Sequence, residues 1–450
     1  MGDKLNRRSK VSNKYIKFWA ATLGLLGEIG IYWILWANIY NPLMSRFLWW
    51  KGVLLVVCVY ALLLFFFQQM YGGLKIGYLR GGNIVYSQLL AITLTNGISY
   101  LQNCLMEAKV LPVSGFALIE LLQCGFVLLW TLIFQKVYAA LFPPRRLLLV
   151  HGSRPAFQLM DKINTRDDKY ILAAAIHASQ GLDVIIESAR NYDAIVLGDI
   201  PSGERNRFLK ACFQNDIRCY TVPKISDILM RTSEELHIFD SPLYLSRNEG
   251  LNPEQELGKR IEDILIAGTG ILLFSPLYLM IALLVKLEDG GSILYKQNRL
   301  TKDGREFQIY KFRTMRMNAE AESGPVLASE QDIRITRVGR VLRACRMDEL
   351  PQLFNILHGE MSVVGPRPER PELAHRIQEE MPEFAYRLKV KAGLTGYAQI
   401  YGKYNTDAYD KLKLDLSYIR EYSVLLDLKL ILLTIKILFM KESTEGVSRQ

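Results

Sequence analysis

The sequence predicts a membrane protein that combines α-helical and α/β structure: a four-helix transmembrane bundle, a Rossmann-like cytoplasmic domain and a third domain with a re-entrant membrane helix. Three observations predict this class. Half of the residues are hydrophobic, which is too apolar for an ordinary soluble enzyme. Long apolar segments precede residue 145, and short β-rich runs alternate with helical ones after it. The expected domains are residues 1–144, 145–250 and 251–450.

The first domain contains four apolar segments, near 15–37, 49–71, 84–105 and 113–140, each long enough for the roughly 20 residues that cross a bilayer. The opposite loops carry only Arg46, Lys51 and Lys109, so the positive-inside rule makes the other ends cytoplasmic. The first segment is expected to be an anchor rather than a removed signal peptide. Glu28, inside it, is either a functional acid or a satisfied interior one. The cations at the cytoplasmic ends are Lys4, Arg7, Arg8, Lys10, Lys14, Lys17, Lys75, Arg80, Lys136, Arg145 and Arg146.

The second domain shows the alternation typical of βαβ units. Strands are expected near 146–150, 171–177, 192–197 and 217–222. A dinucleotide site would need a glycine-rich turn after the first strand, but His151-Gly152-Ser153-Arg154-Pro155-Ala156 stands there. Arg154 and Pro155 would block the approach of a pyrophosphate, which favours a structural or regulatory module.

The third domain begins with an apolar segment, 264–287, that Ser275 and Pro276 interrupt. Proline removes a backbone hydrogen bond there, so the helix should kink sharply. Positive residues flank it on both sides, which favours a re-entrant helix–break–helix hairpin with both ends in the cytoplasm. The alternative is a kinked fifth span. The C-terminal segment 425–440 is either a helix in the headgroup layer or a buried core helix.

The third domain is also strongly basic. The net charge is +10, but the sequence contains no pattern typical of nucleic-acid-binding proteins. The spacing of the six cysteines predicts neither a disulfide framework nor a zinc site. A charge run is usually a solvated face, but here the cations precede two carboxylates and better suit a pocket for polyanions. They are Lys296, Arg299, Lys302, Arg305, Lys311, Arg313, Arg316, Arg334, Arg337, Arg340, Arg343 and Arg346.

The two carboxylates, Asp348 and Glu349, precede a short apolar helix. Asp348 is a good N-cap and Pro351 suits a first helical turn, so the helix terminus should keep both acids ionised. An ordinary acidic helix start is the alternative. Two loops follow: 364–368 presents Arg367, and the glycine-bracketed turn 391–396 offers backbone N–H groups to a phosphate.

Together these residues resemble a known family, the bacterial sugar transferases or monotopic phosphoglycosyl transferases, over about residues 254–441. The long first half resembles the long form of that family. Six ordered motifs carry the resemblance: Ser275-Pro276, Tyr310-Lys311-Phe312-Arg313-Thr314-Met315, Asp348-Glu349-Leu350-Pro351-Gln352, Gly365-Pro366-Arg367-Pro368, Gly393-Leu394-Thr395-Gly396 and Lys413-Leu414-Asp415.

The resemblance implies that a hexose-1-phosphate passes from a UDP-sugar, UDP-galactose or UDP-glucose, to undecaprenyl phosphate, as the first membrane step of O-antigen, capsule or exopolysaccharide synthesis. Asp348 would be the nucleophile, Ser275 and Pro276 would set the membrane dip, and Asp348 and Glu349 would hold Mg²⁺. The expected substrate-binding residues are Lys311, Arg313, Arg337, Arg343, Arg367, Thr395, Gly396 and Asp415.

The family pattern further implies a multi-pass protein of the bacterial inner membrane, with the catalytic domain on its cytoplasmic face, and a homodimer. Three positions depart from it: Asn318 replaces a common acid, while Ile333 and Ala392 replace common prolines. The first departure puts a metal or phosphate role at position 318 in doubt.

Elementary chemistry agrees with this mechanism. A carboxylate that attacks a diphosphate needs cations to offset the repulsion between anions, and the basic pocket supplies them. Attack by Asp348 would release UMP and leave an acyl phosphate that polyprenyl phosphate then attacks. Two alternatives are a glycosyltransferase that releases UDP, which the absence of an Asp-x-Asp pair disfavours, and a sensor that has lost the chemistry.

Overall fold

The computed structural model describes residues 2–152, 157–238, 241–246, 250–316, 332, 334–402 and 406–438. Arg154, Pro155, Asn318, Ile333 and Met440, which the sequence analysis discusses, lie outside these residues. The chain divides into two compact units, Met1–Val222 and Pro223–Gln450. Each unit is described by itself.

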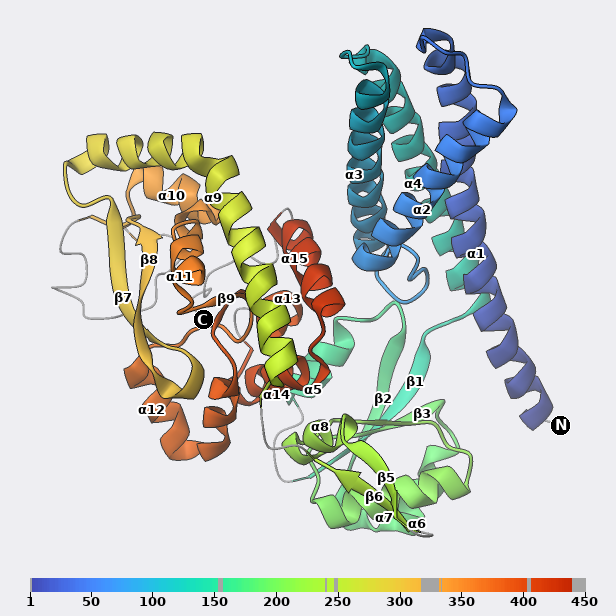
Figure 1. The fold of residues 1–450 in the computed structure, drawn as a ribbon. Coiled ribbons are helices and arrows are strands. Elements are labelled where there is room, and N and C mark those ends of the chain that lie inside the picture. Colours follow the sequence, from blue (N-terminus) through green and yellow to red (C-terminus); the bar gives the residue numbers. More distant parts are fainter. Residues whose placement is uncertain are drawn as a thin grey trace. The chain divides into compact units, whose positions relative to one another are not determined.

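The first unit starts with four long helices that run side by side (Figure 1). They are α1 (Gly2–Ile39), α2 (Trp50–Tyr71), α3 (Gly81–Glu107) and α4 (Val113–Leu141), with a short 3-10 turn, η1 (Asn41–Leu43), after α1. All four are long and apolar enough to cross a membrane, as is a fifth helix in the second unit. The prediction of several membrane-spanning helices is therefore confirmed at this level.

Polar side chains lie in the interior of these helices beside an aromatic core. The Tyr32 and Tyr60 rings stack with centroids 3.5 Å apart. The Tyr60 hydroxyl donates to Asn96 Oδ1 at 2.9 Å, and the Gln123 amide donates to the Tyr60 hydroxyl at 2.8 Å. Glu28 is 1% exposed and accepts a hydrogen bond from Gln68 Nε2 at 2.5 Å. The helices thus pack around a hydrogen-bonded polar seam.

A four-stranded parallel sheet completes the first unit, with the strand order β2-β1-β3-β4. The four strands lie at the four predicted segments, because β-branched and leucine-rich runs are buried between flanking helices. The elements are β1 (Arg145–His151), α5 (Phe157–Asn164), β2 (Tyr170–His177), η2 (Ala178–Gln180), α6 (Leu182–Ala189), β3 (Ala194–Leu197), α7 (Ser202–Gln214) and β4 (Cys219–Thr221). A mixed α/β region follows the membrane helices, as expected.

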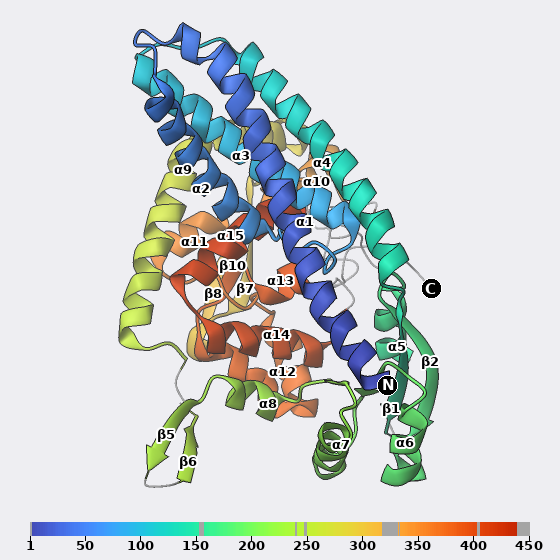
Figure 2. The same ribbon diagram turned by 90° about the vertical axis from the view of Figure 1, so that its right-hand side faces the viewer.

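Residues 223–250 belong to the second unit, whereas the sequence analysis assigns them to the middle domain. Helix α8 (Ile225–Arg231) packs Ile225 and Ile228 into the apolar core of the second unit. Next come β5 (Glu234–Ile238) and β6 (Ser241–Leu245), an exposed antiparallel hairpin that extends away from α8 (Figure 2). These two isoleucines pack into the core of the second unit, so α8 belongs to that unit. No local sequence motif predicts this contact.

Helix α9 (Pro253–Asp289) is the fifth helix that is long enough to span a membrane. Figure 1 shows it as two straight segments joined by a sharp bend, and Pro276 lies inside it. The helix continues through Pro276 and is not interrupted there. The Ser275 Oγ donates a hydrogen bond to the Leu272 carbonyl at 2.8 Å. Leu272 and Leu279 are 78% and 75% exposed, as suits a surface in contact with lipid.

The remaining elements form the compact body of the second unit. The β7–β8 hairpin is antiparallel and the β9–β10 pair is parallel. The elements are β7 (Leu294–Leu300), η3 (Lys302–Gly304), β8 (Glu306–Phe312), α10 (Arg337–Ala344), η4 (Met347–Glu349), α11 (Gln352–His358), β9 (Ser362–Val364), α12 (Pro371–Glu380), η5 (Pro382–Lys389), β10 (Gly393–Thr395), α13 (Tyr397–Tyr401), α14 (Ala408–Glu421) and α15 (Val424–Leu438).

Two buried side chains fix this body around β8 and α15. Asn355 donates to the Gln308 carbonyl at 2.7 Å and accepts from the Tyr310 N–H at 3.0 Å, so it pairs with the edge of β8 as a strand would. Asp427 on α15 is 1% exposed and forms an ion pair with Lys259 of α9. One face of α15 is therefore buried, while Leu425 on another face is 67% exposed.

Candidate active site

The carboxylate pair lies in η4, a 3-10 turn between α10 and α11. Pro351, not Asp348, occupies the N-cap position of α11, so the expected N-cap role of Asp348 is wrong. Arg346, at the start of η4, has φ 53° and turns the chain in the left-handed region. The Tyr278 hydroxyl of α9 donates to the Leu350 carbonyl at 2.5 Å, which ties this turn to the bent helix.

Glu349 is the centre of an ionic cluster. Its Oε1 lies 2.7 Å from Lys311 Nζ on β8 and 3.2 Å from an Arg367 guanidinium nitrogen on the loop after β9. Although burial opposes ionisation, Lys311 and Arg367 hold the pKa of Glu349 well below its usual range. Glu349 is therefore a permanent anion whose charge is neutralised by its neighbours.

Asp348 has the opposite electrostatic environment. Burial and the adjacent Glu349 charge raise the pKa of Asp348, while Lys311 and Arg343 oppose that rise. The sequence-based expectation that a helix terminus stabilises both charges is thus wrong for Asp348, because it lies before the helix and beside another anion. A carboxylate whose charge is poorly compensated is a better nucleophile than an ion-paired one.

Three further predicted arginines lie around the end of α9, but their contacts differ. Arg313 forms an ion pair with Asp289. Arg343 Nε donates to Thr314 Oγ1 at 2.8 Å, directly after β8. Arg337 contacts Glu288 through its backbone N–H, at 2.7 Å from Oε1. Arg313 and Arg343 thus support the strand and helix that carry Lys311 and the acid pair.

Two buried guanidinium groups hold the loop that presents Arg367. Arg387, 4% exposed, donates from Nη2 to the Arg367 carbonyl at 2.9 Å and pairs with Asp415 at 2.8 Å. Arg299 donates to the Pro368 carbonyl at 3.0 Å. Burial and the charge of Arg367 lower the pKa of Arg299 to about 10, which reflects the crowding of cations here. The loop backbone is therefore fixed from behind, and the Arg367 side chain reaches Glu349.

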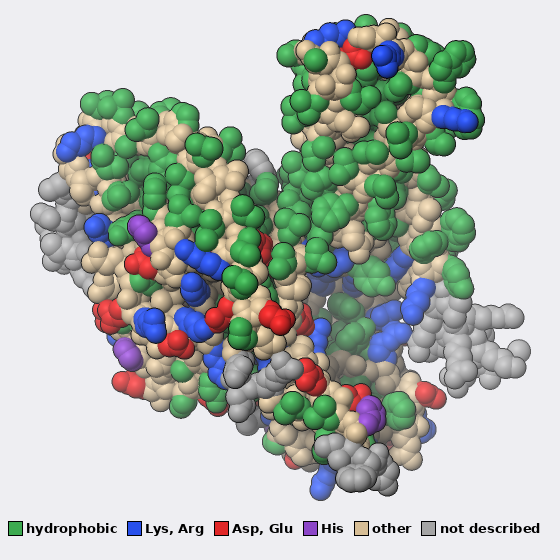
Figure 3. Space-filling view, in the orientation of Figure 1, with side chains coloured by type: hydrophobic (Ala, Val, Ile, Leu, Met, Phe, Trp, Pro, Cys, Tyr) green, Lys and Arg blue, Asp and Glu red, His purple; other side chains and the backbone are tan. Residues whose placement is uncertain are grey.

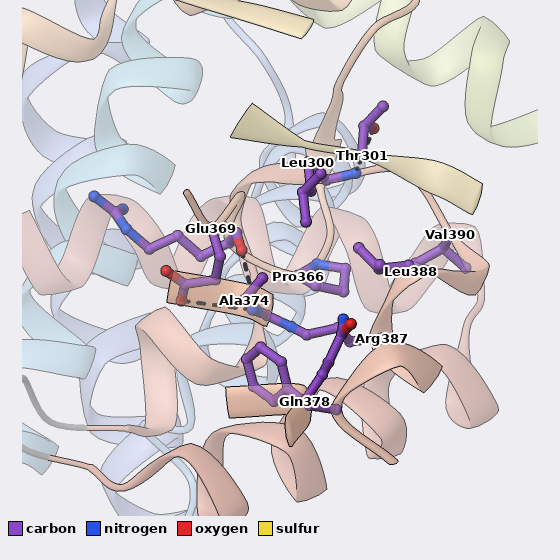
Figure 4. Close-up of a pocket in the computed structure, with 12 residues that line it drawn as sticks. Leu300, Thr301, Pro366, Glu369, Ala374, Gln378, Arg387, Leu388 and Val390 are labelled. Carbon is purple, nitrogen blue, oxygen red and sulfur yellow. Dashed lines mark hydrogen bonds and ion pairs between the residues drawn. The ribbon is translucent and has the colours of Figure 1, made fainter. Parts of the chain in front are cut away.

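A small pocket lies behind this loop (Figure 4). Glu369 lies 3.5 Å from Arg387 in an ion pair at its wall. Apolar side chains, including Leu388 and Val390, line the opposite side. Arg367 lines the pocket together with residues that support its loop, but Asp348 and Glu349 are not among the lining residues, so we do not assign the pocket to a substrate.

Three predicted binding residues point elsewhere. The Thr395 hydroxyl lies 2.7 Å from that of Thr434 on α15, and Asp415 is 1% exposed in its pair with Arg387. A Cβ on Gly396 would lie 2.2 Å from the Gly365 carbonyl, so glycine is required for the close approach of the two loops. The structure thus brings Lys311, Glu349 and Arg367 together beside Asp348, and places the other three in support of the Arg367 loop.

Sequence reasoning missed Arg387, Glu369 and Thr314 as supporting residues. Thr314 lies within a quoted motif and could have been found there. The pairing of Arg387 with Asp415 has no local signal, because nothing in the sequence announces a contact across 28 residues.

Whether this site fits Mg²⁺ depends on which side chains could coordinate the ion. Within the described ranges, no group of three or more His, Cys, Asp or Glu side chains could hold a metal ion. Magnesium commonly takes one or two protein carboxylates and completes its shell with substrate phosphates and water. The adjacent Asp348 and Glu349 therefore fit a phosphate-bound Mg²⁺, although Glu349 is paired with two cations here.

The chain is similar to known proteins over its second half. Residues 254–441 match the model of a family described as bacterial sugar transferase. The UDP-N-acetylgalactosamine-undecaprenyl-phosphate N-acetylgalactosaminephosphotransferase of Aeromonas hydrophila is 40% identical over 254 residues, which is 55% of this chain and 59% of the relative. The UDP-glucose:undecaprenyl-phosphate glucose-1-phosphate transferase of Klebsiella pneumoniae is 40% identical over 220 residues, 46% of this chain and 45% of the relative.

The exopolysaccharide production protein ExoY of Rhizobium meliloti is 37% identical over 214 residues, 43% of this chain and 92% of that protein. The chain thus spans about half the length of the first two relatives and nearly all of the third. The matched region contains every predicted site residue.

Proposed function

Because this chain belongs to the bacterial sugar transferase family, we propose that it transfers a hexose-1-phosphate from a UDP-sugar to undecaprenyl phosphate and releases UMP. The observation that carries this proposal is the contrast within the acid pair. Glu349 is neutralised by Lys311 and Arg367, whereas the charge of the adjacent Asp348 is disfavoured by burial. Such a site has a reactive carboxylate beside cations that attract a diphosphate.

The reaction proceeds in two displacements. An Asp348 carboxylate oxygen attacks the sugar-linked phosphorus, the bond to the bridging oxygen breaks, and UMP leaves with that oxygen. A phosphate oxygen of undecaprenyl phosphate then attacks the same phosphorus, and Asp348 is released as a carboxylate. Each step breaks one P–O bond and forms another, so no oxidant or external energy source is needed.

The cations have separate roles. We assign Lys311 and Arg367, which both contact Glu349, to the substrate phosphates, and Arg343 favours the ionised form of Asp348. Asp348 and Glu349 would hold Mg²⁺, which when bound supplies further positive charge to the phosphates. Arg299 and Arg387 hold the Arg367 loop in place.

The membrane arrangement is part of the proposal. Helices α1–α4 form a four-helix transmembrane bundle in the bacterial inner membrane, followed by a Rossmann-like cytoplasmic module. Helix α9 bends at Ser275 and Pro276 and re-enters on the cytoplasmic face, so the acid pair lies at headgroup depth. The exposed apolar side chains around the bend, and the positive flanks of the helix, support this arrangement.

A homodimer is proposed as well, and the β5–β6 hairpin supports it. Leu243 and Tyr244 are 48% and 62% exposed, and an isolated two-stranded hairpin is marginally stable without a partner. Light scattering in detergent should give twice the mass of one chain. The Tyr244→Asp variant should give the mass of one chain, and an unchanged mass in it would exclude this hairpin as the contact.

The test of function is the identity of the released nucleotide. The purified protein receives undecaprenyl phosphate, Mg²⁺ and, in turn, UDP-glucose, UDP-galactose, UDP-N-acetylgalactosamine and UDP-N-acetylglucosamine. The names of the relatives contain glucose and N-acetylgalactosamine, and the family long form adds galactose. UMP with one donor supports the proposal and names the sugar. Release of UDP would mean simple glycosyl transfer and would overturn it.

A further inference from the structure

Lysine and arginine side chains gather where the four long helices of the first unit meet its parallel sheet (Figure 3). Tyr78, in the loop between α2 and α3, is the centre of this group. Lys17 Nζ of α1 lies 4.0 Å from the centroid of the Tyr78 ring. Lys169 Nζ, at the start of β2, lies 5.3 Å from the same centroid and donates to the Tyr78 carbonyl at 2.6 Å. Two ammonium groups from distant segments thus share one aromatic ring.

The acids nearby are already paired. Arg166 Nε lies 2.8 Å from Asp168, and Arg80 lies 3.5 Å from Asp167. Within the part of the chain that the structure describes, neither Lys17 nor Lys169 forms an ion pair. Asp168 therefore compensates Lys169 only indirectly, because its carboxylate is paired with Arg166.

The titration of Lys169 agrees with this charge imbalance. Burial, followed by the charges of Arg166 and Lys17, lowers the pKa of Lys169 to about 8, although Asp168 opposes this change. A bound anion would reverse the repulsive part of this effect. The cluster of Lys17, Tyr78 and Lys169 is therefore suited to bind an anion.

The position of the cluster indicates where the anion comes from. Lys17 lies close to the start of the candidate membrane span Asn13–Leu43, and its Nζ is 5.2 Å from the centroid of the Tyr138 ring, near the end of α4. Lysines and tyrosines at the ends of membrane helices lie at the depth of lipid headgroups. A phosphate at this depth belongs to a lipid rather than to a soluble metabolite.

We propose that Lys17, Tyr78 and Lys169 form a binding site for the headgroup phosphate of an anionic phospholipid. The phosphate lies between the two ammonium groups, and the lipid joins the parallel sheet to the bilayer beside the ends of α1 and α4. This site is separate from the acid pair, and its existence does not depend on the sugar transferase reaction.

The experiment uses the full-length protein in detergent, with phosphatidylglycerol or phosphatidylcholine added, and counts bound lipids by native mass spectrometry. Phosphatidylglycerol should be retained in preference to phosphatidylcholine. The double variant Lys17→Gln/Lys169→Gln should bind phosphatidylglycerol about twenty-five-fold more weakly, because each lysine near an anionic surface contributes about fivefold. Lys17→Arg/Lys169→Arg, which keeps both charges, should retain binding and shows that loss in the glutamine variant is not a failure to fold.

The matched control is Lys14→Gln/Lys136→Gln. It removes the same amount of charge, from α1 and α4, at exposed positions without a described contact to Tyr78. Its affinity should fall by less than about threefold, since diffuse attraction is weak at physiological salt. An equal loss in the control, equal binding of both lipids by the parent protein, or full displacement of the lipid by millimolar inorganic phosphate would each overturn the lipid site.

Discussion

The buried acid Glu28 among the membrane helices and the acids around the candidate site are compensated differently. Among the membrane helices, Glu28 accepts a hydrogen bond from the neutral amide of Gln68. In the second unit, Asp415 is paired with Arg387 and Glu349 with Lys311, so a full positive charge meets each acid. An amide partner satisfies a carboxyl group without fixing its charge, whereas an ion pair requires both charges and a defined geometry.

The contrast between amide and ionic partners indicates which parts of the molecule require precise geometry. The amide network fills the interior of four helices that have only to pack side by side. The ion pairs lie behind the Arg367 loop and beside Asp348, where the proposed reaction requires each cation to be placed to within about 1 Å. Unlike Glu349, Asp348 lies next to another anion, and burial and the charge of Glu349 raise its pKa. This electrostatic setting supports the proposed role of Asp348 as the nucleophile.

The largest expected effect is that of Asp348→Asn. UMP release should fall by about 10⁴-fold or more, since the nucleophile is lost. Thermal stability should rise slightly. Because the folded pKa of Asp348 is raised, the folded state binds its proton more tightly than the unfolded chain, and the ionised acid costs stability as pH rises through that range.

The control for this variant is Asp303→Asn, which changes an exposed acid on η3. It should leave both UMP release and the melting temperature unchanged. Normal turnover in Asp348→Asn would remove Asp348 from the role of nucleophile.

The second effect tests the ion pairs. Asp415→Asn removes the closer of the two anions that contact the buried Arg387 and leaves only Glu369 at 3.5 Å, so the free energy of unfolding should fall by about 3 kcal/mol. Urea denaturation followed by circular dichroism measures this change. The double variant Asp415→Leu/Arg387→Met removes both charges and should recover part of the stability, but not the UMP release, because the Arg367 carbonyl loses its donor. Full activity in the double variant would show that the loop needs no such support.

A third prediction concerns the pH dependence of turnover. Arg343 opposes the rise in the pKa of Asp348, so Arg343→Gln should move the acidic limb of the pH–rate profile to higher pH. The nucleophile is then ionised only at higher pH. Arg340→Gln, an exposed neighbour on α10, is the control and should leave the limb in place. An unmoved limb in Arg343→Gln would assign that limb to another group.

The smallest effect is expected among the membrane helices. Glu28→Gln keeps the hydrogen-bonding capacity and removes the ionisable group, so the melting temperature in detergent should change by only a few degrees and UMP release should persist. Glu28→Leu, which leaves the Gln68 amide without its acceptor, should destabilise more. A large loss of activity in Glu28→Gln would break the comparison, because it would give the bundle acid a chemical role.

Much of this molecule could be predicted from its sequence. Membrane helices are specified by apolar length, and the strands of the parallel sheet by buried runs between turns. The cluster at Glu349 could be predicted because Lys311 and Arg367 lie in recognisable motifs. Asp415 shows the limit of such motifs. Its position was predicted to bind substrate, whereas the structure buries it against Arg387, a partner that only the fold brings near.

The turn that carries the acid pair shows a second limit. Asp348 and Pro351 are good helix-start residues, but the chain forms a 3-10 turn first, and Tyr278 of the bent helix fixes it from outside. Likewise, the extent of the second unit depends on Ile225 and Ile228 entering a core that lies far ahead in the sequence. Tertiary contacts determine where this turn forms and where the second unit begins, and such contacts cannot be predicted from local sequence patterns.

Asn355 has a consequence for solubility in the cell. Its side-chain amide occupies the Gln308 carbonyl and the Tyr310 N–H, both on the edge of β8. An unpaired strand edge is a template on which another polypeptide can add, and such addition leads to aggregates. The side-chain amide of Asn355 occupies two of the backbone groups on this strand edge. Another polypeptide therefore finds the β8 edge already occupied at Gln308 and Tyr310.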